Sequence, residues 1–198
     1  MDARLFRVVA IGAAAALAGC AAQTPPTQVT RFHLGQPIAP AEVAVEPRDP
    51  TSTQSLEFQT YADAVRGELA RNGFRPAPNV ARSEVVAVMD LMRGTRPGAP
   101  QSAPFSIGLG GGSFGGGVGI GGGLSIPVGK RRSNELVGTE LSVQLKRRSD
   151  GTVIWEGRAR NEARAGTPAA SSGVAATKLA AALFQGFPGE SGRTILVK

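Results

Sequence analysis

The chain has 198 residues, with 22 Lys and Arg against 15 Asp and Glu, and its formal net charge is +7 at neutral pH. This length accommodates one ordinary domain with short tails and allows a genuine hydrophobic core. A basic chain can bind anionic partners, although a moderately basic surface is also consistent with solubility alone. The single cysteine excludes an intramolecular disulfide.

The first 19 residues have the pattern of a bacterial secretory signal peptide. Arg4 and Arg7 supply a short positive region, and residues 8–18 form an uncharged, mostly apolar run. That run has the length of a signal-peptide core and is too short to span a bilayer as a permanent helix. It ends in Leu-Ala-Gly-Cys, which resembles the bacterial lipobox. We therefore expect cleavage before Cys20 and lipidation of its thiol.

Lipidation of Cys20 would determine where the protein works, because two or three acyl chains anchor a protein far more firmly than one. Ala21 follows, in place of the aspartate that resembles an inner-membrane retention signal. We expect an anchor in the inner leaflet of the outer membrane, with residues 20–27 as a tether and residues 28–198 as a single periplasm-facing domain. Export argues against nucleic acid as a partner.

The first elements of the domain are predicted to be strands. Apolar and polar residues alternate over residues 28–34, which favours a strand with Val29 and either Phe32 or Leu34 facing the core. A second, short strand is predicted around residues 44–45. It is short because Pro47 and Pro50 follow and end the strand pattern.

The clearest helix is predicted over residues 55–72, where Asn72-Gly73 gives a stop signal. Apolar residues recur there at the spacing of one helical face: Phe58, Tyr61, Ala62, Val65 and Leu69. A strand is then predicted to begin at residues 74–77, and another is predicted over residues 83–93. The latter is apolar on both faces, which favours an interior position in a sheet.

Residues 139–163 give the clearest hairpin, with Asp150-Gly151 at its turn. Its alternation predicts one charged face and one buried face, and the buried face includes Leu141, Val143, Leu145, Val153 and Trp155. We expect Trp155 to be a core residue rather than a platform for a ligand.

A second helix is predicted to begin at Thr167-Pro168 and to run to about Gln185. The residues expected to face the core are Val174, Ala175, Leu179, Ala182 and Leu183. Residues 193–197 can form a final edge strand. This order of elements predicts an α+β fold, with a largely antiparallel sheet and two helices packed on one face.

A glycine-rich insert over residues 97–134 interrupts this pattern. No helix follows it, so it matches neither a phosphate-binding loop nor a dinucleotide fingerprint. Alternating apolar residues favour a projecting hairpin, and a disordered loop is the alternative. The insert and the basic cluster after it supply the candidate contacts to a partner or membrane: Phe105, Phe114, Lys130, Arg131 and Arg132.

Residues with catalytic or metal-binding chemistry are scarce. His33 is the single histidine, and no Cys/His cluster accompanies it to hold a metal. The spacing Gly-x-Ser-x-Gly occurs once, at residues 111–115 inside the glycine-rich insert, where no helix follows to make it a nucleophile elbow. We therefore expect no metal, no cofactor and no enzymatic activity, and a binding or structural role in the cell envelope. The alternative is a periplasmic enzyme that acts on an envelope polymer.

In the order of its elements, the chain resembles the bacterial lipoproteins that carry domain of unknown function 4136. The elements that carry the resemblance are the lipobox, the helix ending Leu-Ala-Arg-Asn-Gly-Phe, the strand over residues 85–91, the insert, and the strand pair 141–145 and 153–157. The resemblance covers about residues 28–197. It implies an envelope lipoprotein with an envelope protein, lipid or cell-wall partner, and no established activity. Members often carry aromatic residues among the glycines, whereas this insert has mainly Phe105 and Phe114, so an aromatic platform is not implied.

Overall fold

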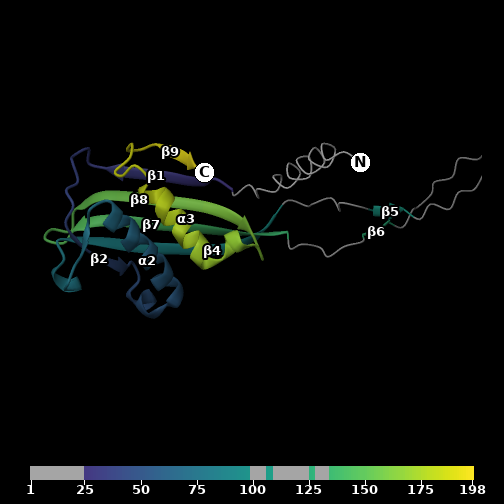
Figure 1. Cartoon of the computed structure of the whole chain (residues 1–198), viewed down its shortest axis with the longest axis horizontal. Helices are drawn as coiled ribbons and strands as arrows, with labels where there is room; N and C mark the ends of the chain where they lie inside the picture. Colours follow the sequence, from purple (N-terminus) through teal and green to yellow (C-terminus); the bar gives the residue numbers. More distant parts are fainter. Residues whose placement is uncertain (1–24, 99–105, 109–124, 128–133) are drawn as a thin grey trace, which may run out of the picture.

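A mixed sheet of seven strands forms the body of the protein, in the order β3-β2-β4-β7-β8-β1-β9 (Figure 1). The computed structural model describes residues 25–98, 106–108, 125–127 and 134–198. The strands of this sheet are β1 (Thr27–His33), β2 (Glu42–Pro47), β3 (Arg75–Pro76), β4 (Val85–Pro97), β7 (Glu135–Arg147), β8 (Val153–Arg164) and β9 (Thr194–Val197). The helices are α2 (Leu56–Arg71) and α3 (Ser172–Phe184).

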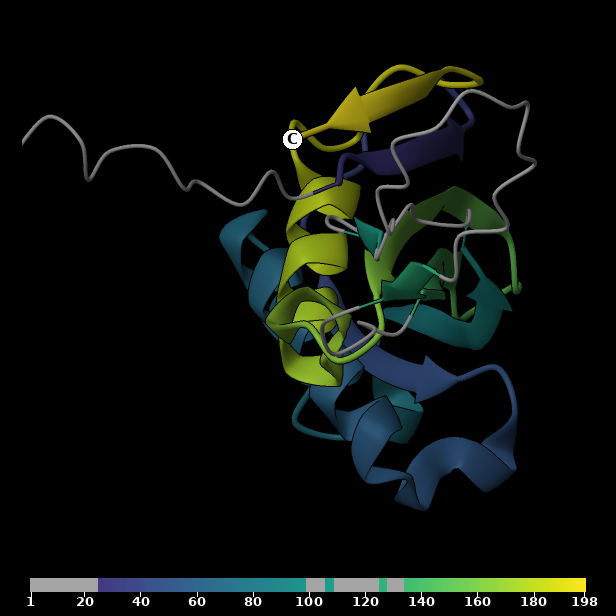
Figure 2. The ribbon, with the colours of Figure 1, turned by 90° about the vertical axis from the view of Figure 1, so that its right-hand side faces the viewer.

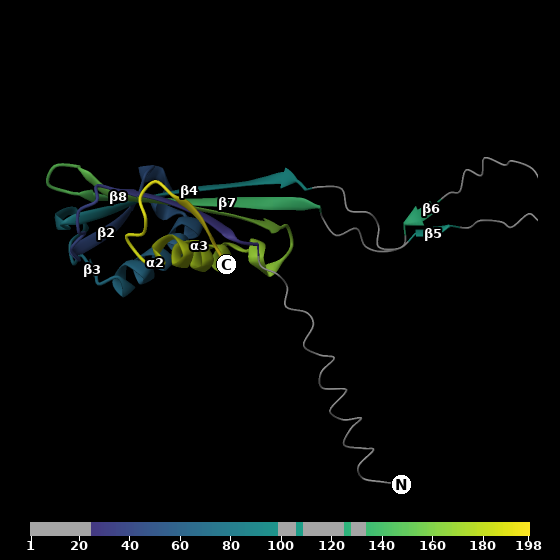
Figure 3. The ribbon, with the colours of Figure 1, turned by 90° about the horizontal axis from the view of Figure 1, so that it is seen from above.

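The α+β class and the largely antiparallel sheet are confirmed. Strand β2 pairs in parallel with β3 and β4, and every other pair in this sheet is antiparallel. Both helices pack on the same face of the sheet (Figures 2 and 3). We call the opposite face, which no described helix covers, the uncovered face.

Helix α2 follows the expected pattern closely. Its predicted face is buried, and none of its five apolar side chains is more than 6% exposed. The Ser55 hydroxyl accepts a hydrogen bond from the Phe58 amide at 3.3 Å and so caps the first turn. Gly73 ends the helix with φ +87°, a conformation that side chains with a Cβ rarely adopt.

The predicted start of the second helix is wrong. Thr167-Pro168 begins a separate 3₁₀ turn, Pro168–Ala170, and α3 starts only at Ser172. Val174 therefore lies in the first turn of α3, where it is 47% exposed rather than buried. The other four residues expected to face the core are buried.

Strand β1 directs a different set of side chains into the core than the sequence predicts. Val29 is buried as expected, but Phe32 and Leu34 are 49% and 61% exposed. Alternation from Val29 brings Arg31 onto the helix-covered face, where it is only 4% exposed. Its guanidinium donates to the Leu183 and Ala182 carbonyls at the end of α3, at 2.9 and 2.8 Å. These bonds explain how a charged side chain occupies the place of an apolar one.

The predicted hairpin is the pair β7–β8, and Trp155 is fully buried as expected. The prediction for Val153 is wrong. A bulge between Leu145 and Lys146 shifts the register, so Val153 pairs with Lys146 and is only partly buried.

The insert begins and ends as a hairpin. Strands β4 and β7 stay paired as far as Pro97 and Glu135, and the Gly98 amide then donates to the Asn134 carbonyl at 2.7 Å. Within the insert, β5 (Ser106–Gly108) pairs antiparallel with β6 (Ser125–Pro127). Figure 1 shows this second sheet beyond the ends of β4 and β7.

Candidate functional site

The uncovered face is polar and hollowed. Because side chains alternate along each strand, every second residue of β4, β7 and β8 lies on it. Two adjoining pockets of about 350 and 310 Å³ open on this face, and both are lined by Met92 and Glu140. The uncovered face therefore holds the candidate functional site.

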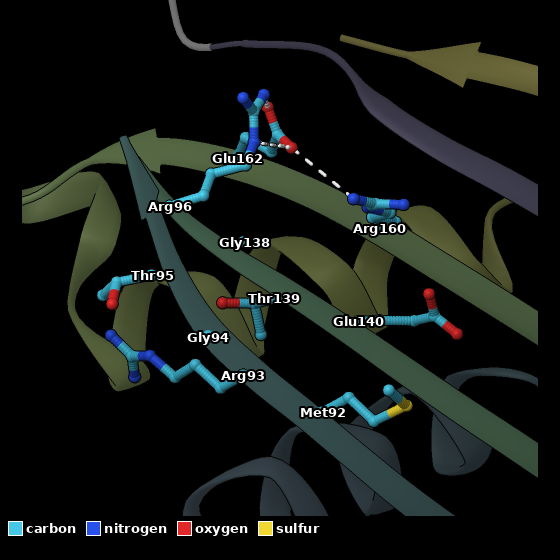
Figure 4. Close-up of a pocket in the computed structure, with 10 residues that line it drawn as sticks. All are labelled: Met92, Arg93, Gly94, Thr95, Arg96, Gly138, Thr139, Glu140, Arg160 and Glu162. Atoms are coloured by element: carbon cyan, nitrogen blue, oxygen red, sulfur yellow. Dashed lines mark hydrogen bonds and ion pairs between the residues drawn. The ribbon is translucent and has the colours of Figure 1, made fainter. Parts of the chain in front are cut away.

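Two glycines form the floor of the larger pocket (Figure 4). Gly94 of β4 and Gly138 of β7 are direct partners across the two strands. A Cβ built at Gly94 would meet no atom within 4 Å, and one at Gly138 would meet only the Gly94 carbonyl oxygen, at 3.9 Å. The pocket thus exists because both side chains are missing. We call it the glycine-floored hollow.

The strand geometry itself does not require these glycines, because neither Gly94 nor Gly138 has a positive φ. A glycine inside a strand costs roughly 0.5–1 kcal/mol relative to alanine. Such glycines often mark a place where a ligand or another backbone approaches closely. Because β4 and β7 pair without a bulge here, the pair makes this place on the sheet a candidate for such a close approach.

Charged side chains form one rim of the hollow. Arg96 donates two hydrogen bonds to the Glu162 carboxylate, at 2.6 and 3.1 Å, and an Arg160 nitrogen lies 3.6 Å from the same carboxylate. The hydrogen bonds and charge of Arg96, with the charge of Arg160, lower the pKa of Glu162 from its ordinary value. The Glu162 carboxylate also raises the pKa of Arg96. Both shifts favour the charged forms of the two groups, as expected for an ion pair.

Two further charges on this face have no partner in the part of the chain that the structure describes. Glu140 faces the larger pocket and Arg158 lines the smaller one, and neither side chain makes a hydrogen bond or ion pair there. Arg48 and Asp90 line the smaller pocket as well, with 3.3 Å between Nε and Oδ2. Among the described residues that line the two pockets, Glu140 and Arg158 are therefore the charged side chains left free for an occupant.

The site residues expected from the sequence all fall outside the described residues. They are Cys20, Phe105, Phe114, Lys130, Arg131 and Arg132. Sequence reasoning missed the glycine-floored hollow, because the predicted strands stop at residue 93 and begin at residue 139, whereas β4 and β7 continue through Gly94 and Gly138. Their significance appears only from the register, which sets them opposite each other.

His33 has a structural role, as expected. The Gly35 amide donates to Nδ1 at 3.1 Å, which leaves the proton of the neutral ring on Nε2 for the Gly189 carbonyl, also at 3.1 Å. The ring thus ties the end of β1 to the loop before β9. Among the described residues, no three His, Cys, Asp or Glu side chains gather to hold a metal ion. Neither helix in that part of the chain is long and apolar enough to cross a bilayer.

Known proteins similar to this chain carry little functional information. A protein of Zymomonas mobilis described as uncharacterized is 36% identical over 215 residues, covering 88% of this chain and 81% of that protein. A PDZ domain protein from Parabacteroides distasonis has 10% identity and a TM-score of 0.49, over 89% of this chain and 40% of that one. The PelC dodecamer from Paraburkholderia phytofirmans has 15% identity and a TM-score of 0.43, over 79% of this chain and 94% of that one. The family model of the domain of unknown function DUF4136 matches residues 27–189, so the chain belongs to the DUF4136 family.

Proposed function

We propose that this protein is a non-catalytic binding protein of the cell envelope, anchored in the outer membrane through a lipid on Cys20. The glycine-floored hollow is its binding site. The observation that carries the binding role is the pairing of Gly94 with Gly138, which leaves sheet backbone open at a cost in stability. The lipobox pattern that ends at Cys20 supports the anchor.

The charges around the hollow restrict the kind of partner. Glu162 holds two arginines in fixed positions, and Glu140 beside it is unpaired among the described residues. A purely cationic or purely anionic partner would meet repulsion from one of these groups. The site suits an envelope partner that is polar and carries both signs of charge, and that can lie flat on the glycine floor.

Lipidation is tested by metabolic labelling. Palmitate supplied to growing cells should be incorporated into the wild-type protein and not into Cys20→Ser, because the thiol is the acylation site. Mass spectrometry should also show that residues 1–19 are absent from the mature wild-type chain. A mature chain that retains them would show that the anchor is wrong.

Filling the hollow should separate binding from stability. In the double variant Gly94→Val, Gly138→Val, each added Cβ has open space above the floor, and valine favours the strand conformation. We expect the free energy of unfolding, measured by urea denaturation, to be unchanged or to rise by roughly 0.5–1 kcal/mol per site. Met92 is 64% exposed beside the hollow and is replaced by a photo-crosslinking residue. In cells, this residue should form a crosslinked product with the partner when the glycines are present, and the product should be lost in the double valine variant.

Gly67→Ala is the matched control for this experiment. Gly67 lies on an exposed position of α2, and a Cβ there would meet nothing within 4 Å. Alanine should stabilise the helix by about 1 kcal/mol and leave the crosslink unchanged. If crosslinking at Met92 persists in the double valine variant, the hollow is not the binding site.

A further inference from the structure

We infer that the end of the sheet next to the tether faces the bilayer; this rests on the proposed lipid anchor. We call it the tether end. Strand β1 begins there at Thr27, and Thr27 pairs with Val197 at the end of β9. The end of β8 lies opposite the start of β7, which in turn pairs with the end of β4. Figures 1 and 3 show the ends of β4 and β7 leading toward β5 and β6 on this side.

The length of the tether limits how the domain can stand on the membrane. Five residue steps separate Cys20 from Pro25, and an extended chain spans at most about 3.6 Å per residue, so this link reaches about 18 Å. Pro25 is fixed to the domain, because its carbonyl accepts a hydrogen bond from Lys178. Strand β7 has 13 residues and is about 43 Å long at roughly 3.3 Å per residue. The tether is thus shorter than the sheet is long. The opposite end of the sheet, which we call the far end, therefore cannot face the bilayer while the tether end points away from it.

Both helices also begin at the tether end. The Glu57 carboxylate in the first turn of α2 accepts hydrogen bonds from Arg93 of β4 and from the Ser172 hydroxyl of α3, each at 2.9 Å. Three exposed apolar side chains lie at these starts and on β9: Leu56 is 84%, Val174 47% and Leu196 65% exposed. Such side chains are tolerated at a lipid–water interface, where their apolar parts leave water.

Three arginines add charge complementarity to phospholipid phosphates. Arg96 and Arg160 share the single carboxylate of Glu162. Arg164, at the end of β8, has no ion pair within the described part of the chain. Guanidinium groups bind phosphate oxygens through charge-assisted hydrogen bonds, and each cation near an anionic leaflet strengthens the attraction. The occupant of the tether end is therefore the phospholipid surface that holds the anchor.

This orientation also places the glycine-floored hollow. Gly94 lies three residues before Pro97, so the hollow is about 10 Å from the tether end at roughly 3.3 Å per residue. With the strands standing on the bilayer, the uncovered face opens sideways. A partner in the hollow would then bind in the layer next to the headgroups.

Two labelled variants test the orientation in the full lipidated chain. Thr95→Cys carries a fluorophore near the tether end, and Ser149→Cys carries it near the far end; both positions are exposed and they lie roughly 35 Å apart along the strands. Cys20 is the sole natural cysteine, and its thiol would carry the lipid. The vesicles contain phosphatidylethanolamine, phosphatidylglycerol and a lipid with a nitroxide on its headgroup. We expect the Thr95 label to be quenched severalfold more strongly than the Ser149 label.

The outcomes separate the orientation from the anchor. If both labels are quenched equally, or Ser149 more strongly, the orientation is overturned and the anchor stands. If the protein fails to float with the vesicles, the anchor is overturned, and the orientation with it. Arg164→Glu should weaken quenching at the Thr95 label, because phosphatidylglycerol repels the new carboxylate. The control is Arg193→Glu, because Arg193 precedes the start of β9, at the end of β9 away from the bilayer. This control should leave quenching at the Thr95 label unchanged. If both variants change the quenching equally, the contact between Arg164 and the phospholipid is excluded.

Discussion

Replacing Trp155 by alanine should lower the free energy of unfolding by about 3–5 kcal/mol, as measured by urea denaturation followed by circular dichroism. The indole is fully buried and stacks on Phe184, with 5.3 Å between ring centroids, and Phe187 lies 5.2 Å away. A Cβ built at Gly157 would lie only 2.6 Å from a ring carbon, so the pocket around the indole is tightly filled. Alanine would leave a large cavity between β8 and α3.

Trp155→Phe is the matched control for this prediction. It retains an aromatic ring against Phe184 but removes the Nε1 donor, whose partner is the Pro188 carbonyl at 3.0 Å. We expect a loss smaller than that of Trp155→Ala, because most of the cavity stays filled. A loss below about 1 kcal/mol for the alanine variant would contradict the buried position and make the ring a candidate ligand platform.

Replacing Arg31 by methionine should cost about 2–4 kcal/mol of stability in the same denaturation assay. Methionine fills similar space but donates no hydrogen bond, so the buried carbonyls of Ala182 and Leu183 would lose their donor. An unsatisfied buried polar group costs about 1–3 kcal/mol. Burial lowers the pKa of the Arg31 guanidinium, and the partial negative charge at the end of α3 offsets part of this desolvation.

Arg31→Lys distinguishes the hydrogen bonds from the charge alone. Lysine keeps the positive charge at the helix end but lacks the planar fork that reaches two carbonyls at once. We expect a loss of stability intermediate between wild type and Arg31→Met. If Arg31→Met costs less than about 0.5 kcal/mol, water or a neighbouring donor has replaced the guanidinium.

Periodicity predicted the parts of the fold in which one face is uniformly apolar. The helix around Tyr61 and the hairpin around Leu141 were found this way, because burial selects a single repeating face. The same reasoning failed for β1, since a buried arginine satisfies carbonyls from a helix about 150 residues later in the chain. It failed for Val153 because a bulge changes register without a strong local signal. These two errors depend on tertiary contacts that a local pattern does not contain.

The candidate site was less predictable than the fold. A glycine in a strand is ambiguous in sequence, since it can mark a bulge, a bend or a close approach. Only the pairing of Gly94 with Gly138 shows that two of them share one place on a face. The proposed anchor differs from the hollow, because a lipobox is a linear pattern that can be recognised in the sequence alone. Lipidation at Cys20 is therefore a prediction from the sequence, whereas the hollow is visible only in the folded structure.

The position of β1 between β8 and β9 has a consequence for the order of folding. Thr30 and Thr194 share a hydrogen bond although they lie 164 residues apart in the sequence, so both neighbours of β1 come from the last quarter of the chain. Closing so long a loop is slow compared with forming the β7–β8 hairpin. A chain that emerges N-terminus first cannot complete β1 until its C-terminus has followed. Strand β1 therefore takes its place in the sheet late, after the rest of the domain has been synthesised.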